Sequence, residues 1–248
     1  MPHQWNEAAT LRREQIESGL DLTFSDVFVP WYRDRIADLK PARVVELGAG
    51  TGHLAKELHC LTDEYIAFEP SAGMHRVATD VLAATAVRVE LATAQQANVT
   101  DADLIVAHLC VHVIDELDQV LRAVADMLAP AGRLLAAIPH PCFYNDYKRF
   151  FDKGELSYMR EQSKEVSFTI TADPTREIAG VPYHHRPLSV YVASLVAAHF
   201  ALVGLHEIVP SEAVMKRYGT PWVTPRYLVL EAMRHYASCK LPSSEPTS

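Results

Sequence analysis

The feature that most constrains this chain is a set of alternating glycines placed directly after an apolar segment. Residues 42–47 are mostly apolar, and glycine then occupies Gly48, Gly50 and Gly52. The apolar run predicts a buried strand. The glycines allow a sharp turn and a close approach of the backbone to a ligand, where any Cβ would collide. A helical pattern resumes at Leu54, so the loop leads into a helix N-terminus with free N–H groups.

An acidic residue follows the next apolar run at the distance that a nucleoside site requires. Residues 64–69 predict a second strand, which ends in Glu69. In nucleotide-binding α/β folds, a carboxylate about 20 residues after the glycine loop faces the ribose hydroxyls. Strand, glycine loop, helix, strand and acid together predict a nucleoside-binding half-fold.

The glycine spacing distinguishes between two kinds of nucleoside ligand. A dinucleotide fingerprint, G-x-G-x-x-G, has its third glycine where this chain has His53. Here the spacing is G-x-G-x-G, and Glu46 stands two residues before the first glycine. A carboxylate at that place repels a pyrophosphate but suits a ligand with an ammonium and a sulfonium group. The pattern therefore disfavours a nicotinamide-dependent oxidoreductase.

At this point residues 44–52 resemble the first motif of the class I S-adenosylmethionine-dependent methyltransferases. The resemblance implies S-adenosylmethionine as the cofactor, with Glu69 holding both ribose hydroxyls. The family often has an aspartate at the adenine, near the end of the third strand, and here Thr93 or Gln95 takes its place. The residues that we expect at the cofactor are Glu46, Gly48, Ala49, Gly50, Gly52, Glu69, Pro70, Thr93, Ala94 and His108.

Strand and helix patterns alternate along the chain, which predicts an α/β fold with a mostly parallel sheet covered on both faces. The expected strands are 42–47, 64–69, 86–91, 103–108, 133–138, 202–208 and 226–232. The expected helices are 5–18, 22–38, 52–60, 72–84, 114–128 and 188–199, with Asp115 as an N-cap and the turn 130–132 ending that helix. The resemblance implies a Rossmann-like, doubly wound sheet of about seven strands, in which 227–232 is antiparallel and lies between the fifth and sixth.

We expect a single domain over residues 1–240, followed by a disordered tail at 241–248. Residues 1–38 form an N-terminal helical segment that can act as a lid. Residues 139–187, inserted after the fifth strand, form a cap over the acceptor site. Within the cap, 166–171 can pair with 180–186 as a hairpin.

Two histidines are candidate catalytic residues. His140 lies between two prolines directly after the fifth strand, at the sheet edge where ligands bind in open α/β folds. It can serve as a general base or orient the acceptor; the alternative is a turn histidine bonded to backbone. His112, where the resembling family often has a histidine near the cofactor, is the second candidate. Although His108 and Cys110 lie beside it, these side chains need not converge, so we expect no metal site.

The candidate acceptor-binding residues lie in the cap. Tyr144 and Tyr147 belong to an aromatic stretch, and Arg186 can pair with a carboxylate or phosphate. The alternatives are that the aromatic stretch forms the core of the cap and that Arg186 makes a structural salt bridge. Trp5, Phe24, Trp31 and Tyr32 are possible pocket walls.

Composition narrows the choice of partner. The formal net charge is −8 and the Lys and Arg residues are dispersed, which counts against a nucleic-acid substrate. The four cysteines are scattered without a C-x-x-C pair, which is typical of reduced thiols in a cytoplasmic protein. Neither a signal peptide nor a membrane span is evident in the sequence.

The sequence therefore predicts a methyltransferase that acts on a small-molecule metabolite by direct in-line transfer to oxygen, nitrogen or an acidic carbon. Two alternatives stay open. One is methylation of a protein or RNA, and the other is a non-catalytic S-adenosylmethionine-binding regulator. The oligomeric state does not follow from the sequence.

Overall fold

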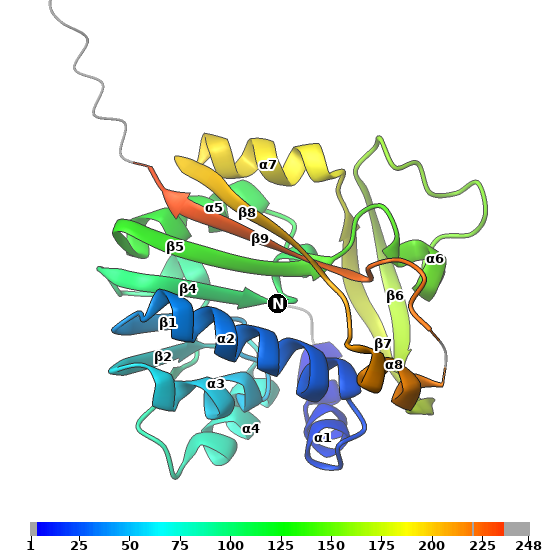
Figure 1. Ribbon diagram of the computed structural model, residues 1–248, viewed down its shortest axis with the longest axis horizontal. Coiled ribbons are helices and arrows are strands. Elements are labelled where there is room, and N and C mark those ends of the chain that lie inside the picture. The colour runs from blue at the N-terminus through cyan, green and yellow to red at the C-terminus, as the bar shows by residue number, and fades with distance from the viewer. Residues whose placement is uncertain (1–3, 220, 236–248) are drawn as a thin grey trace, which may run out of the picture.

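A seven-stranded sheet forms the centre of the computed structural model, which describes residues 4–219 and 221–235 (Figure 1). The strands are β1 (Arg43–Leu47), β2 (Glu64–Phe68), β3 (Arg88–Glu90), β4 (Ala102–His108), β5 (Leu128–Pro139), β8 (Phe200–Ile208) and β9 (Tyr227–Arg234). Their order is β3-β2-β1-β4-β5-β9-β8, and β9 is antiparallel to both of its neighbours. The predicted sheet, with an antiparallel strand between the fifth and sixth, is confirmed. The predicted tail 241–248 lies outside the described residues.

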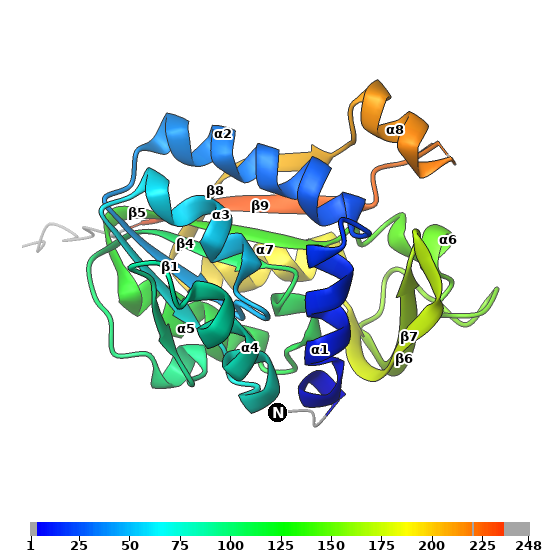
Figure 2. The ribbon, with the colours of Figure 1, turned by 90° about the horizontal axis from the view of Figure 1, so that it is seen from below.

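Helices cover both faces of this sheet. They are α1 (Gln4–Glu17), α2 (Val29–Leu39), α3 (His53–Leu58), α4 (Ala72–Leu82), α5 (Leu117–Met127), α6 (Tyr144–Lys148), α7 (Leu188–Ala197) and α8 (Glu212–Tyr218). A π-helical segment spans Thr23–Phe28, and short 3-10 turns span His59–Leu61, Ala94–Gln96 and Val111–Val113. Because successive strand residues point to opposite faces, Val44 packs with α2, α3 and α4 while Val45 packs with α5 and α7. Figures 1 and 2 show these two layers.

The cap is a two-stranded hairpin of β6 (Gln162–Ile170) and β7 (Asp173–His185), with α6 beside it. Val166 pairs with Val181, as the predicted hairpin requires. Figure 1 shows the cap beyond the carboxyl ends of the parallel strands, and Figure 2 shows α1 crossing between α4 and the hairpin. The site therefore has a nucleoside-binding loop below and two covering elements above.

Two local predictions are wrong. Residues 111–113 form a 3-10 turn, so α5 begins only at Leu117, and Asp115 is exposed rather than its N-cap. The turn 130–132 lies inside β5, where the pairing with β4 jumps from Leu128 to Arg133. The turn is therefore a bulge within β5, and the pairing with β4 continues after it.

Among the described helices, none combines the length and the apolar character that a membrane span requires.

Candidate functional site

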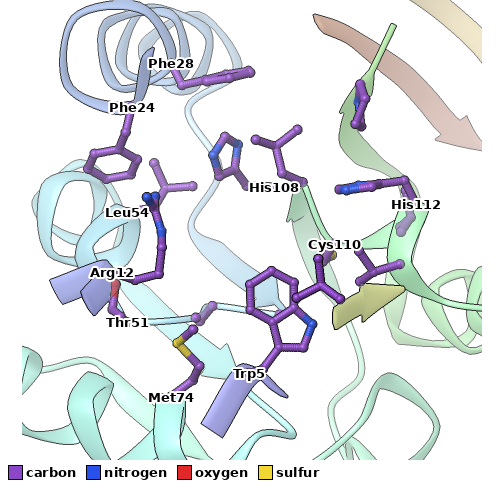
Figure 3. Close-up of a pocket in the computed structure, with 18 of the residues that line it drawn as sticks. Trp5, Arg12, Phe24, Phe28, Thr51, Leu54, Met74, His108, Cys110 and His112 are labelled. Carbon is purple, nitrogen blue, oxygen red and sulfur yellow. The ribbon is translucent and has the colours of Figure 1, made fainter. Parts of the chain in front are cut away.

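A cavity of about 550 Å³ opens at the carboxyl edge of the sheet. Its floor is made by the loops after β1 and β4 and by the end of β2, and its upper walls are α1, the π-helical segment and the cap. Figure 3 shows side chains from these separate elements pointing toward the same space. A cavity of this size and mixed lining is typical of a small-molecule or cofactor site.

The three loop glycines have different surroundings, although all of them adopt a left-handed backbone. A Cβ added to Gly48 would lie 2.6 Å from Cβ of Cys110, and one added to Gly52 would lie 2.9 Å from Leu82 of α4. A Cβ added to Gly50 would meet nothing within 4 Å. Gly50 therefore faces the open cavity, and Gly52, which does not line it, is needed for close packing of α4 against the loop.

Glu69 anchors the loop from the end of β2. Its Oε2 accepts the N–H of Gly50 at 2.7 Å, and its Oε1 accepts the N–H of Ser71 at 2.7 Å. Burial raises the pKa of Glu69 to about 7, although both N–H bonds oppose the rise. Each carboxylate oxygen can accept a further hydrogen bond, so two ribose hydroxyls can bind here.

Glu46 is a second buried carboxyl in the floor of the cavity. Only 2% of it is exposed, and the Tyr65 hydroxyl donates to its Oε2 at 2.9 Å. Burial raises the pKa of Glu46 to about 8, and the nearby Glu69 carboxylate adds to the rise. A cationic ligand in the cavity would favour the ionised form, because opposite charges attract strongly where water is excluded.

The other predicted cofactor residues are distributed around the same floor. Figure 3 shows Trp5, Met74 and Cys110 among the side chains of the cavity wall. Apart from Gly52, every residue that we expected at the cofactor lines the cavity: Glu46, Gly48, Ala49, Gly50, Glu69, Pro70, Thr93, Ala94 and His108.

Two histidines from the β4 end line the cavity, and among the described residues neither has a charged partner at hydrogen-bond distance. Nδ1 of His108 lies 3.4 Å from the Tyr32 hydroxyl, and burial lowers the pKa of His108 to about 4. His112 packs edge-on against Tyr183, and its buried Nδ1 has no hydrogen-bond partner among the described residues. Burial, with a contribution from Arg186, lowers the pKa of His112 to about 3. Both rings are therefore neutral at neutral pH.

The predicted catalytic residue His140 does not line the cavity. Its Nδ1 accepts the N–H of Cys142 at 3.2 Å, and its Nε2 lies 3.3 Å from Glu207 of β8. Both ring nitrogens thus lie at hydrogen-bond distance from protein groups outside the cavity, Cys142 and Glu207. The geometry corresponds to the alternative interpretation of His140 as a turn histidine.

Arg186 also lies outside the cavity. Its Nη2 donates to the carbonyls of Ile114 and Asp115, and its Nε lies 3.6 Å from Glu161. Arg186 therefore fixes the turn that carries His112 instead of facing an acceptor. Neither of the adjacent histidines, His184 and His185, lines the cavity.

Tyr144 and Tyr147 do line the cavity, on α6. Of the four possible pocket walls in the N-terminal segment, Trp5 and Phe24 line it, whereas Trp31 and Tyr32 pack behind it. Sequence reasoning missed several residues of the cavity wall, which come from α1, the π-helical segment and the residues before it, the cap and α8: Arg12, Asp21, Phe28, Lys148, Phe168, Arg217 and Tyr218. Their only sequence signal is their position within the predicted lid and cap, or after β8.

Within residues 4–219 and 221–235, no three His, Cys, Asp or Glu side chains form a group that could hold a metal ion. His108, Cys110 and His112 follow one another at alternate positions but point to separate surroundings, as Figure 3 shows.

Residues 45–134 match the family model described as a methyltransferase domain. A search of curated proteins found no match to the chain. Among solved structures, an S-adenosylmethionine-dependent methyltransferase from Mesorhizobium loti has a TM-score of 0.62 at 19% identity, covering 83% of this chain and 98% of that one. One from Clostridium acetobutylicum ATCC 824 has a TM-score of 0.64 at 15% identity, covering 94% and 99%.

The 1,6-didemethyltoxoflavin-N1-methyltransferase of Burkholderia thailandensis has a TM-score of 0.55 at 18% identity and covers 93% of this chain and 89% of that one. At such identities the structural likeness concerns the fold. The family match covers β1 to β5, the part of the chain that carries the glycine loop and Glu69. Residues 45–134 thus carry a methyltransferase domain, and the motif and the sheet order agree with the fold of the S-adenosylmethionine-dependent methyltransferases.

Proposed function

We propose that this methyltransferase modifies a small organic acceptor, at an oxygen, a nitrogen or an acidic carbon. The observation that carries the proposal is the continuity of the cavity. The space that begins at Gly50 and Glu69 extends beneath α6 and the β6–β7 hairpin, where Tyr144 and Tyr183 line it. A cap that covers an acceptor in this way suits a small molecule better than a protein or RNA surface.

The residues present fit the cofactor that the family uses. Glu69 would hold the ribose hydroxyls, and the ionised form of Glu46 would attract the cationic end of the molecule. The open space at Gly50 gives the backbone of the loop close contact with the ligand. When bound, S-adenosylmethionine supplies an electrophilic methyl group, so the chain needs to hold the acceptor atom in line with it and exclude water.

His112 is the proposed hydrogen-bond acceptor for the substrate in this site. Its Nδ1 is buried, lacks a hydrogen-bond partner among the described residues, and belongs to a side chain that lines the cavity. A neutral imidazole can accept a hydrogen bond or a proton from an acceptor hydroxyl or amine. The two carbonyl contacts of Arg186 hold the turn that positions this ring.

One structural neighbour supports a small acceptor. The Burkholderia thailandensis enzyme is described with bound 1,6-didemethyltoxoflavin and S-adenosylhomocysteine, and its chain is covered almost completely by this fold. The dispersed basic residues and net charge of −8 also favour a small molecule over RNA.

The test is the destination of a labelled methyl group. The purified protein is incubated with methyl-tritiated S-adenosylmethionine and a cell extract divided into ultrafiltrate, protein and RNA fractions. We expect label in the ultrafiltrate with the wild type and none with Glu69→Ala. Label in the protein or RNA fraction would instead show a macromolecular substrate. Cofactor binding by calorimetry without transfer to any fraction would indicate a regulator.

A further inference from the structure

In the part of the chain that the structure describes, one cation at the cap end of the cavity has no counter-ion. Lys148 ends α6, and its Nζ donates to the carbonyl oxygen of Thr169 at 2.5 Å. The ammonium also lies 4.7 Å from the ring centroid of Tyr147 and 5.9 Å from that of Phe168. Over residues 4–219 and 221–235, no carboxylate lies within ion-pair distance of Lys148. The side chain lines the cavity and retains donors for another partner.

A second cation meets the same tyrosine ring. The guanidinium carbon of Arg226 lies 3.7 Å from the centroid of Tyr147 and 4.4 Å from that of Trp222. Arg226 is only 9% exposed, and in the described part of the chain it too has no carboxylate at ion-pair distance. Aromatic faces stabilise such cations only partly, because the lost hydration is larger than the ring contact returns.

Arg226 does not itself line the cavity, and the Lys and Arg side chains that line it besides Lys148 are neutralised. Arg12 pairs with Asp21 at 2.6 Å, and Arg217 pairs with Asp26 at 2.9 Å. The excess of positive charge is therefore confined to the region of Tyr147, within a chain whose net charge is −8. A local field of this sign favours an anionic group on the ligand.

The walls next to this region favour a flat ring. Tyr144, Phe150 and Tyr183 form a cluster with centroids 5.0–6.3 Å apart, and Tyr227 lies 5.5 Å from Tyr144. Two hydroxyl groups of the cap belong to the same wall: the Tyr147 hydroxyl lies 2.9 Å from Oγ1 of Thr171, and both residues line the cavity. Rings and hydroxyls of this kind hold an aromatic body and the oxygens of its anionic group.

We propose that the acceptor is an aromatic carboxylate whose carboxylate group is bound by Lys148. This inference rests on the proposed function, since it names the class of acceptor for the same cavity. Lys148 orients the aromatic ring by its charged end, so that the opposite end reaches toward His112 and the cofactor. Lys148 is a specificity residue, and its loss removes the preference for an anion without closing the cavity.

The test compares two probes that differ in charge but not in shape, 2-naphthoate and 2-naphthamide, by fluorescence titration of the protein saturated with S-adenosylhomocysteine. We expect the wild type to bind the naphthoate about fivefold more tightly or better, the factor that corresponds to ~1 kcal/mol. Lys148→Met should bring the two affinities to within about twofold without changing naphthamide binding, and Lys148→Arg should retain the preference. Lys153→Met, at an exposed lysine of the same cap that does not line the cavity, is the matched control.

Equal binding of the two probes by the wild type, or binding of neither, would overturn the proposal. So would a preference that survives in Lys148→Met. Failure of the proposed function would give different results. The protein would then not bind S-adenosylhomocysteine, or would not transfer the labelled methyl group to small molecules.

Discussion

Gly50 and Gly52 have similar backbones but unlike neighbours, which gives a matched pair of substitutions. Their φ angles are +56° and +76°, so alanine at either position carries a left-handed strain of ~1–2 kcal/mol. Gly52→Ala also collides with α4, and we expect it to lower the free energy of unfolding by a further ~1–3 kcal/mol. Gly50→Ala places its methyl group in the cavity, and we expect cofactor affinity to fall about tenfold or more.

Denaturant unfolding and calorimetry separate the two effects. Gly52→Ala should keep an affinity close to that of the wild type at a temperature where it is folded. An affinity loss in Gly52→Ala as large as that in Gly50→Ala would contradict the assignment of the two glycines.

The buried carboxyl of Glu46 links stability to pH. Its pKa rises from the ordinary value of 4.5 to about 8 on folding, so its contribution is fully present below about pH 4.5 and is lost as pH rises through 8. We expect the ligand-free protein to lose stability between pH 6.5 and 8, a range in which His108 and His112 stay neutral.

Glu46→Gln should remove the share of this loss that belongs to Glu46, leaving the part due to Glu69, whose pKa burial raises to about 7. The Tm at pH 8 should rise by ~2–4 °C for each kcal/mol recovered. The substitution should also weaken cofactor binding, because the carboxylate charge is gone. Thermal unfolding of wild type and variant at several pH values measures the difference, with Glu64→Gln at the other end of the neighbouring strand as control. Parallel pH curves for wild type and Glu46→Gln would argue against a buried, protonated Glu46.

At the scale of elements, α1 is tied to both sides of the cavity that it crosses. Oδ1 of Asn6 accepts the N–H of Gly73 at 2.7 Å and the hydroxyl of Ser71 at 2.9 Å, at the start of α4. At its other end, Gln15 donates to Asp173 of β7 at 3.0 Å. These bonds hold α1 in its place between α4 and the hairpin (Figure 2), where Trp5, Arg12 and Ile16 line the cavity.

We expect Asn6→Ala to accelerate release of S-adenosylhomocysteine about fivefold or more, since two partly buried hydrogen bonds worth ~1 kcal/mol each are lost. Stopped-flow displacement measures the rate. Thr10→Ala, at an exposed position of α1, should release the ligand at the wild-type rate. Equal rates in Asn6→Ala and wild type would show that α1 does not control access.

The elements that the sequence predicts well are those whose pattern is local. Apolar runs mark β1, β2 and β4, and the glycine loop and Glu69 follow from spacing alone. The direction of His140 was not predictable, because Glu207, 67 residues later in the chain, attracts its ring. Lys148 was missed for a related reason: α6 has only five residues, too few for a helical period to appear.

At the scale of the whole molecule, the cavity joins parts of the chain from α1 to α8, so a ligand that fills it stabilises the entire fold. At a concentration of S-adenosylhomocysteine 100 times its Kd, the expected gain is ~2.7 kcal/mol. For a chain of this size that gain corresponds to a rise in Tm of ~5–10 °C. Differential scanning fluorimetry measures it, and Glu69→Ala at the same ligand concentration should show a much smaller rise. A wild-type Tm that does not respond to the ligand would contradict binding in this cavity.

The position of β9 has a consequence for biosynthesis. β9 lies between β5 and β8, and Leu228 and Val229, both fully buried, lie along its pairing with β5. About 95 residues separate the end of β5 from the end of β9, and a ribosome takes ~5–20 s to add them. During that interval the backbone edge of β5 has no strand to pair with, and such an edge invites pairing with other chains. A nascent chain arrested before Tyr227 should therefore bind chaperones and stay expanded. Once β9 has left the ribosome, the chain should become compact and chaperone binding should stop.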